Sequence, residues 1–301
     1  MISGGGVPTP NVDPDLLPAG GGGGMRYLAS RRSRMFGGRR GAVVSAASTI
    51  VFLGVVAVLV ATAPGTPIIR QRFFDWGHIK QAFPSVASGF LLNIKIMLIA
   101  EVLILAFALL LAVVRSIPGP VFFPLRLVAI GYVDLFRGMP LILVLYLIGF
   151  GVPALSLRGL SNHDVVTYGI LSLVLVYSAY VAEVYRAGID SVHESQTMAA
   201  RSLGLSRWQA LRHVVIPQAI RRVIPPLLND FIGLQKDTAL VSVIGPIEAA
   251  RQAQNFGAET FNFAGYVVAA FLFVVCTIPL ARFVDYLIAR DRRRRAMGST
   301  R

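Results

Sequence analysis

Charged and amide side chains interrupt the most apolar segments of this 301-residue chain. Lys236 and Asp237 stand out, because a charge near the centre of a bilayer costs at least ~2.5–3.5 kcal/mol on insertion scales. These two residues are neighbours in sequence, so they cannot face each other on one helix. Each of them needs a partner on another helix, water or a solute. The same argument gives a set of candidates for a polar path through the membrane: Asn93, Lys95, Glu101, Glu183, Gln235, Lys236, Asp237 and Thr238.

The sequence leaves two roles open for these polar side chains. In the first, they form an ion-pair network that only ties helices together, with Glu101, Glu183 or Lys95 as partners of the adjacent Lys and Asp. In the second, they line a hydrophilic path or pocket at mid-depth in the membrane. Pro225 and Pro226 are expected to kink or break their helix near its start and to free backbone carbonyls there.

The sequence gives little support to a metal site, a redox site, an ATP site or an enzyme active site. The four histidines, at positions 78, 163, 193 and 213, lack metal-ligand spacing, and Cys276 is the only cysteine, so we predict no metal site and no redox pair. No lysine follows a glycine, so the chain has no Gly-x4-Gly-Lys-Ser/Thr loop and cannot hold ATP by that route. We therefore expect no catalytic residue and no cofactor, and a membrane enzyme is disfavoured.

Composition places the polar candidates in a membrane protein. Hydrophobic residues make up 55% of the chain and charged residues only 15%, whereas soluble domains carry ~25% charged residues. Crossing a bilayer takes ~20 helical residues, and the apolar segments predict an all-α, polytopic membrane protein with six transmembrane helices. The predicted spans are Ala42 to Ala63, Ala87 to Val114, Leu127 to Phe150, Val165 to Tyr185, Val223 to Gly245 and Phe261 to Ala289.

The distribution of basic residues orients these spans. With six spans and a cytoplasmic N-terminus, 20 of the 29 Lys and Arg residues lie in inner segments, five in outer segments and four within spans. This distribution follows the positive-inside rule and predicts that both termini lie on the cytoplasmic side of the plasma membrane. Without the polar fifth span, the run from Arg290 to Arg295 would lie outside. The net charge of +14 thus serves membrane orientation, and no nucleic-acid partner is expected.

The two ends of the chain differ from the spans. Residues 1–40 are Gly-rich and then basic, which predicts a disordered cytoplasmic tail, and Met25 is an alternative start. Residues 41–64 are predicted to form an uncleaved anchor helix. The alternative is a cleaved signal peptide, because residues 61–63 have a small-x-small pattern. Residues 290–301 form a second basic tail.

The longest connection between predicted spans, residues 187–218, is expected to contain two short helices hinged at Gly204. Good helix formers occupy the segment from Glu194 to Leu203, and Gly204 suits a left-handed C-terminal cap. Ser206 and Gln209 have the spacing of a capping box for the second helix.

The second helix of this loop is predicted to be amphipathic. Trp208, Leu211 and Val215 form an apolar stripe at helical spacing, and Pro217 is expected to end the helix. Such an apolar stripe is expected to be buried against another surface. The loop therefore either lies on the lipid surface or docks in a groove of a cytoplasmic partner.

Four ordered blocks of the sequence resemble the membrane subunits of ABC importers. Met198-Ala199-Ala200, Gly204 four residues later and Val214-x-Ile216-Pro217 together resemble the EAA motif of those subunits (Glu-Ala-Ala-x3-Gly-x9-Ile-x-Leu-Pro). Three further blocks, at residues 132–140, 182–189 and 236–245, look like segments of polar amino acid permeases. The resemblance covers about residues 87–289.

The resemblance implies a type I ABC importer transmembrane domain over residues 87–289, with one additional N-terminal helix and polar amino acids as solutes. Besides membrane lipid, it implies as partners a cytoplasmic ATP-binding-cassette ATPase dimer, a second permease subunit of the same or a sister chain, and an extracytoplasmic amino-acid-binding protein. In this family the loop helix enters a cleft of the ATPase, which implies that ATPase coupling involves Glu194, Met198, Ala199, Ala200, Gly204, Trp208 and Pro217.

The chain departs from the family pattern at three points. Met198 occupies the position of the leading Glu of the motif, and Glu194, one helical turn earlier, is a candidate substitute. Met139 replaces the Thr before Pro140, and the family commonly has five spans. The rival function is an ion-coupled secondary transporter with Lys236, Asp237 and Glu183 as a relay, which would need internal repeats that the sequence does not show.

Overall fold

The computed structural model of this protein describes the chain from residue 39 to residue 298, except residue 118. Side chains are described for residues 41–117 and 119–290. All regular structure within this part of the chain is helical, which confirms the all-α fold class. The helices are connected by short turns, as expected for a membrane protein.

Several predictions concern residues outside this part of the chain. The predicted disordered tail lies outside it except for its last two residues, and so does the alternative start at Met25. Residues 299–301, at the end of the basic tail, also lie outside. The chain divides into two compact units, residues 1–67 and 68–301, and each unit is described by itself.

In the first unit, α2 (Arg39–Thr62) forms where the anchor at residues 41–64 was predicted. It is one of the helices that are long and apolar enough to cross a membrane. The Thr62 hydroxyl donates to the carbonyl of Val58, one turn earlier, at 2.8 Å. Because lipid offers no hydrogen-bond partner, such internal bonding suits a helix within a bilayer.

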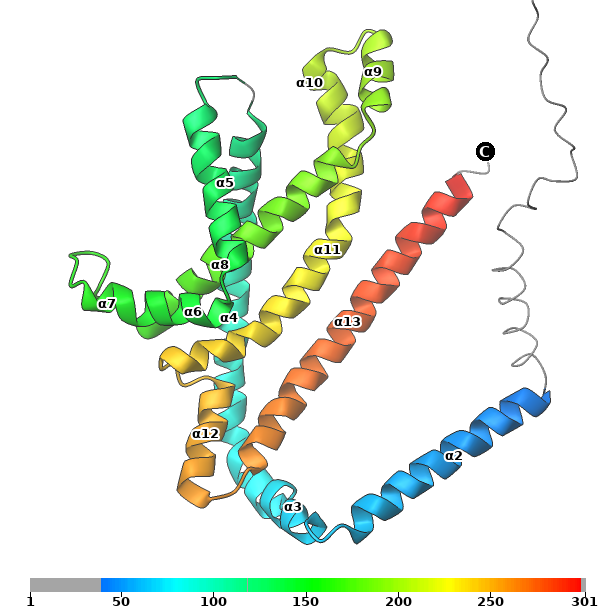
Figure 1. The fold of residues 1–301 in the computed structure, drawn as a ribbon, viewed down its shortest axis with the longest axis vertical. Helices are drawn as coiled ribbons and strands as arrows, with labels where there is room; N and C mark the ends of the chain where they lie inside the picture. The colour runs from blue at the N-terminus through cyan, green and yellow to red at the C-terminus, as the bar shows by residue number, and fades with distance from the viewer. Residues whose placement is uncertain (1–38, 118, 299–301) are drawn as a thin grey trace, which may run out of the picture. The chain divides into compact units, whose positions relative to one another are not determined.

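In the second unit, α4 (Trp76–Ser116) is the longest helix and contacts α5, α8, α11, α12 and α13 (Figure 1). Asp75 caps its N-terminus by accepting a hydrogen bond from the His78 N–H at 2.9 Å. The helix α8 (Val165–Asp190) crosses α4 and forms with it the largest apolar core of the unit. Both helices are long and apolar enough to span.

The third predicted span is a bent pair rather than one helix, which corrects the prediction from Leu127 to Phe150. The helix α5 (Phe123–Gly138) is followed by α6 (Leu141–Tyr146), and the two segments meet at an angle of 107°. Pro140 causes the break, since it lacks an N–H and forces Met139 into an extended conformation. After α6 come the π-helical turn η2 (Leu147–Gly151) and α7 (Val152–Ala154).

The fifth predicted span, Val223 to Gly245, overlaps the second part of α11 (Ile216–Asp237), which begins earlier and continues through Pro225 and Pro226. Of the two expected effects of these prolines, a kink or a break, the break is therefore wrong. Tight packing favours the continuous helix, because Gly188 of α8 leaves no room for a Cβ beside Val223 of α11, so the two helices are in close contact two residues before Pro225.

After α11 the chain forms the 3₁₀ segment η4 (Thr238–Ile244), α12 (Ala249–Thr260) and α13 (Ala264–Gly298). Within the part of the chain that the structure describes, four helices qualify as spans alone, and the bent pair makes five. A total of six spans, as predicted, would require α11 to span the membrane as well, but α11 is too polar to qualify by composition.

Candidate functional site

The loop between α8 and α11 contains α9 (Glu194–Ser202) and α10 (Arg207–Ala210), at the end of the second unit opposite α12 (Figure 1). Gly204 follows α9 with φ +89°, which confirms the predicted left-handed cap. The Gly204 N–H donates to the Arg201 carbonyl at 3.0 Å and the Leu205 N–H to the Ala200 carbonyl at 3.3 Å. These two bonds are the Schellman pattern, so the end of α9 is fixed by backbone geometry.

The start of α10 confirms the predicted capping box. Ser206 Oγ accepts from the Gln209 N–H at 3.2 Å, and Gln209 Oε1 accepts from the Ser206 N–H at 2.8 Å. Both turns that flank the hinge are thus held by reciprocal hydrogen bonds.

Pro217 does not end this second helix, which corrects the prediction. The π-helical turn η3 (Leu211–Val215) joins α10 directly to α11, with the Ile216 N–H bonded to the carbonyl of Leu211. A wider turn accommodates a residue that has no N–H and whose ring would clash with the carbonyl four residues earlier. The helical path consequently runs from Arg207 to Asp237.

The π-helical turn also divides the predicted apolar stripe. Leu211 and Val215 pack with Val192 and Ala219 in a small core that closes the loop onto the start of α11. Trp208, by contrast, is 64% exposed, because the turn takes it off that face.

Met198 of α9 is likewise exposed, whereas Ala200 is buried. The loop is anchored to α11 at two points. Gln218 of α11 donates to Gln196 of α9, and Arg222 donates to the carbonyl of Ser191. The loop therefore presents large apolar side chains, among them Met198 and Trp208, on a framework that is closed by its own packing and hydrogen bonds.

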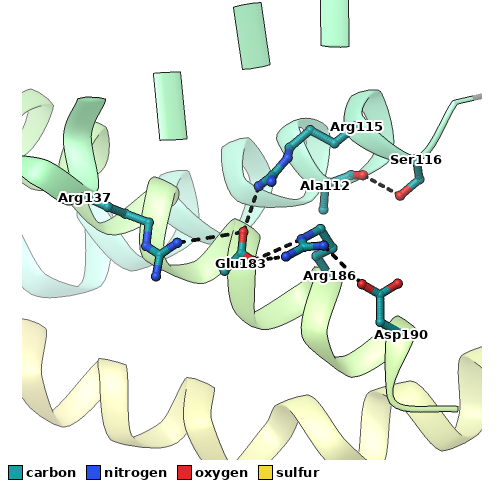
Figure 2. Close-up of polar contacts among 7 residues, drawn as sticks. All are labelled: Ala112, Arg115, Ser116, Arg137, Glu183, Arg186 and Asp190. Atoms are coloured by element: carbon teal, nitrogen blue, oxygen red, sulfur yellow. Dashed lines mark hydrogen bonds and ion pairs between the residues drawn. The ribbon is translucent and has the colours of Figure 1, made fainter. Parts of the chain in front are cut away.

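Glu183 is the centre of an ion-pair cluster that joins α4, α5 and α8 (Figure 2). Arg115 of α4 donates to Glu183 Oε2 at 2.8 Å, and Arg186 donates from Nε to Oε1 at 3.0 Å. Arg137, at the end of α5, lies 4.0 Å from Oε2. Asp190 accepts from Arg186 at 3.2 Å. Glu183 is thus the acidic group on which three guanidinium groups converge, and it does not pair with Lys236.

A second polar cluster is fully buried and joins α4 to the start of α12. Asn93 Nδ2 donates to Glu248 Oε2 at 2.9 Å and to Thr238 Oγ1 at 3.2 Å, and Asn93 Oδ1 accepts from the Ala249 N–H at 3.1 Å. Glu248 also caps α12 by accepting from the N–H of Arg251 at 2.8 Å. Asn93, Thr238 and Glu248 are each at most 1% exposed, so in this conformation they hold elements together and do not face a solute.

Close packing of α4 with α12 accompanies this cluster. A Cβ at Gly89 would lie 2.7 Å from the backbone of Glu248 and Ala249, so only glycine allows the approach. Glu248 was not among the candidates from sequence. Its position directly before a helix, after Gly245-Pro246, is the signal that could have indicated a cap.

The remaining candidates have separate environments. Asp237 accepts from the Tyr177 hydroxyl of α8 at 2.8 Å. Gln235 accepts from Thr277 of α13 at 2.7 Å, and its Nε2 has no partner among the described residues. Glu101 of α4 is half-buried.

The two lysines among the candidates differ from these residues. The side chains of Lys95 and Lys236 are exposed and form no hydrogen bond or ion pair within the described part of the chain. The expected pairing of Lys236 or Asp237 with Glu101, Glu183 or Lys95 is therefore wrong, because Asp237 is bound by a tyrosine and Glu183 by arginines.

We expect Asn93→Leu to lower stability by about 2–3 kcal/mol, because it leaves the Ala249 N–H buried without a partner and removes one hydrogen bond from the buried Glu248 carboxylate. Thermal unfolding of the purified protein in detergent measures the effect. Ser88→Ala is the matched control on the same helix, since Ser88 is exposed and bonds only to Ser85, and it should change stability by less than about 0.5 kcal/mol. Equal losses in both variants would refute the bracing role of the cluster.

The fold and these sites define an all-helical membrane protein with several candidate spans and a doubly capped loop between α8 and α11. Residues 119–293 match the family described as binding-protein-dependent transport system inner membrane component. The match covers more than half of the chain, which therefore belongs to this family.

Relatives and solved structures agree with this assignment. The probable glutamine ABC transporter permease protein GlnM of Bacillus subtilis is 37% identical over 195 residues, 64% of this chain and 88% of that protein. The glutamate/aspartate import permease protein GltK of Escherichia coli O157:H7 is 32% identical over 229 residues, 72% of this chain and 98% of that protein.

Among solved structures, the crystal structure of an amino acid ABC transporter with histidines has a TM-score of 0.66 and 34% identity, covering 72% of this chain and 98% of that chain. The inward-facing MetNI methionine ABC transporter has a TM-score of 0.56 at 16% identity, which supports the fold alone. The chain is a permease subunit of an ABC importer, and the family implies a separate ATPase subunit and a substrate-binding protein as partners.

Proposed function

We propose that this chain carries polar amino acids inward across the plasma membrane as one of two permease subunits, with both termini in the cytoplasm. The solute class is supported by relatives that are named for glutamine and for glutamate/aspartate, and by the 34% identity to an amino acid ABC transporter. The orientation is supported by the excess of basic residues in the predicted inner segments. A delivery protein on the outer side and an ATPase dimer on the inner side complete the transporter.

The coupling element of this proposal is the loop that contains α9 and α10. Exposed Met198 and Trp208 provide apolar anchors for a groove of the ATPase, while Gly204 and the capping box set the angle between the two helices. The remaining candidate coupling residues lie on the same framework: Glu194 in the first turn of α9, Ala199 and Ala200 in its second half, and Pro217 at the start of α11.

A displacement of the loop can be transmitted into the helix bundle along one continuous helical path. The helical path from Arg207 to Asp237 is about 45 Å long at ~1.5 Å per residue, with only a π-helical turn within it. Its far end leads into η4, which the Asn93 cluster connects to α4 and α12. A stiff helix transmits a displacement that a flexible loop would absorb, so nucleotide-driven closure of the ATPase can move the helices around the path.

The polar candidates then fall into two groups. Glu101, Lys95, Lys236 and Asp237 are at least partly accessible, and we assign them to the solute path. Asn93, Gln235 and Thr238 are buried and position the path, and Glu183 holds α4 and α8 together.

The single observation that carries the proposal is the exposed, doubly capped loop that continues into α11 in a member of this importer family. Purification of the complex from native membranes tests it. We expect an ATPase chain to co-purify and a polar amino acid, presented by the co-purified binding protein, to stimulate ATP hydrolysis. Stimulation by a sugar or a metal ion instead would overturn the solute class, and absence of any ATPase chain would overturn the coupling role.

A further inference from the structure

A short amphipathic segment precedes the longest helix of the second unit and has no role in the transport proposal. It comprises the part of α3 (Thr66–Phe73) from Ile68 onward and the first turn of α4, and we name residues 68–80 the outer corner. Arg70, Arg72 and Lys80 are its cations, and Asp75 is its one acidic residue. The outer corner is therefore both basic and rich in apolar side chains.

The outer corner is fixed at the level where the last span begins. The Phe263 N–H donates to the Arg72 carbonyl at 2.8 Å, and Arg72 Nη1 donates to the Phe261 carbonyl at 2.7 Å. Phe73 and Phe263 stack with ring centroids 5.0 Å apart. Because the apolar candidate span starts at Ala264, the next residue, the outer corner lies beside the end of that span, where the boundary between the hydrocarbon core and the headgroups is expected.

The other side of the outer corner is uncovered. Trp76 is 67% exposed, and Phe74, Ile68 and Ile69 are each more than half exposed. Lys80 lies over the Trp76 ring at 5.4 Å from its centroid. The Arg70 side chain is exposed and has no hydrogen bond or ion pair within the described part of the chain. A tryptophan beside cations is the residue combination that prefers the membrane interface, with the ring among the upper acyl chains and the charge among phosphates.

We propose that the outer corner binds the headgroups of anionic phospholipids, with Trp76 inserted at the interface and Arg70 and Lys80 bound to the lipid phosphates. Charge complementarity favours this occupant, because three cations oppose one carboxylate, and the Asp75 carboxylate is engaged by His78 at 2.7 Å. The surface is also continuous with the start of the last candidate span, which is largely exposed. The site anchors one end of α4 to the bilayer and does not depend on the solute.

The chain contains two tryptophans, so Trp208→Phe leaves Trp76 as the only one. We would reconstitute this variant of the full chain in nanodiscs with phosphatidylcholine brominated at successive acyl positions. The expected result is strong fluorescence quenching by bromine near the headgroup end and weaker quenching near the chain end. Absence of quenching at every depth would overturn the proposal, whether the emission indicates water or a covering protein.

A second measurement tests the charges in the wild-type tryptophan background. Native mass spectrometry in mixed phosphatidylglycerol and phosphatidylcholine should show preferential retention of phosphatidylglycerol. Arg70→Gln or Lys80→Gln should reduce that preference about five-fold, and the double variant by about thirty-fold at low salt, since each cation near an anionic surface is worth about 1 kcal/mol. Arg158→Gln, in the exposed turn after α7, is the matched control and should retain the preference. An unchanged preference in the double variant would overturn the headgroup assignment.

Discussion

Replacing Gly204 with proline is expected to abolish both co-purification of the ATPase and ATP-driven uptake, while insertion in the membrane is retained. Gly204 has φ +89°, whereas proline is fixed near −65°, and the variant also loses the N–H that bonds to Arg201. The Schellman end of α9 cannot form, so α9 no longer has a fixed angle to α10. Co-purification from membranes, compared at equal expression, measures the effect as an expected loss of at least about ten-fold.

Two further variants separate loop geometry from loop chemistry. Gly204→Asn should retain most of the association, because asparagine tolerates the left-handed conformation. Trp208→Glu should abolish association with the cap intact, since it places a charge at the exposed apolar anchor. If the proline variant bound the ATPase at the wild-type level, the loop would not be the docking element.

Replacing Glu183 with glutamine is expected to have the second largest effect, a loss of about 2–3 kcal/mol of stability together with a loss of uptake. The change leaves Arg115 and Arg186 without the carboxylate on which both converge (Figure 2). Removing one partner of a fully buried pair costs about 3–5 kcal/mol, and we reduce this value because the Glu183 side chain is 22% exposed. Thermal unfolding in detergent and uptake in vesicles provide the two readouts.

The same cluster provides its own control. Asp190 also pairs with Arg186, but its side chain is 62% exposed, so Asp190→Asn should cost less than about 0.5 kcal/mol. Combining Arg115→Met with Glu183→Gln should recover part of the stability, because the uncompensated guanidinium is removed. Similar losses for Glu183→Gln and Asp190→Asn would show that the cluster does not brace α4 against α8.

The sequence correctly predicted those features that depend only on residues close to each other in the chain. The cap at Gly204 and the box formed by Ser206 and Gln209 depend on bonds between residues at most five positions apart, so their spacing predicted them. The apolar segments likewise predicted most of the helices, because the bilayer requires long runs of apolar residues.

The prolines differ in their effect on helix continuity. Pro140 breaks the helix, whereas Pro225 lies within a continuous one and Pro217 follows a π-helical turn. The difference is tertiary: close packing of α8 against α11 near Val223 favours the continuous helix. Sequence alone identifies a residue without an N–H, but not whether neighbouring helices compensate for it.

The partners of the polar side chains were also beyond prediction. Asn93 and Glu248 are 155 residues apart in sequence, and Glu183 and Arg115 are 68 apart. Candidate charges could be identified because apolar runs make them conspicuous, but pairing requires the packing of α4, α8 and α12. The tyrosine that binds Asp237 carries no charge and gave no signal in the sequence.

The central claim is that ATP hydrolysis by a partner subunit, transmitted through the loop at Gly204, drives this permease. Uptake into proteoliposomes tests it most directly, with the complex purified from native membranes compared with this chain alone. We predict that the complex accumulates a polar amino acid only with its binding protein and ATP, and that the chain alone accumulates none under a proton or sodium gradient. Accumulation by the chain alone under such a gradient, without ATP, would contradict the account.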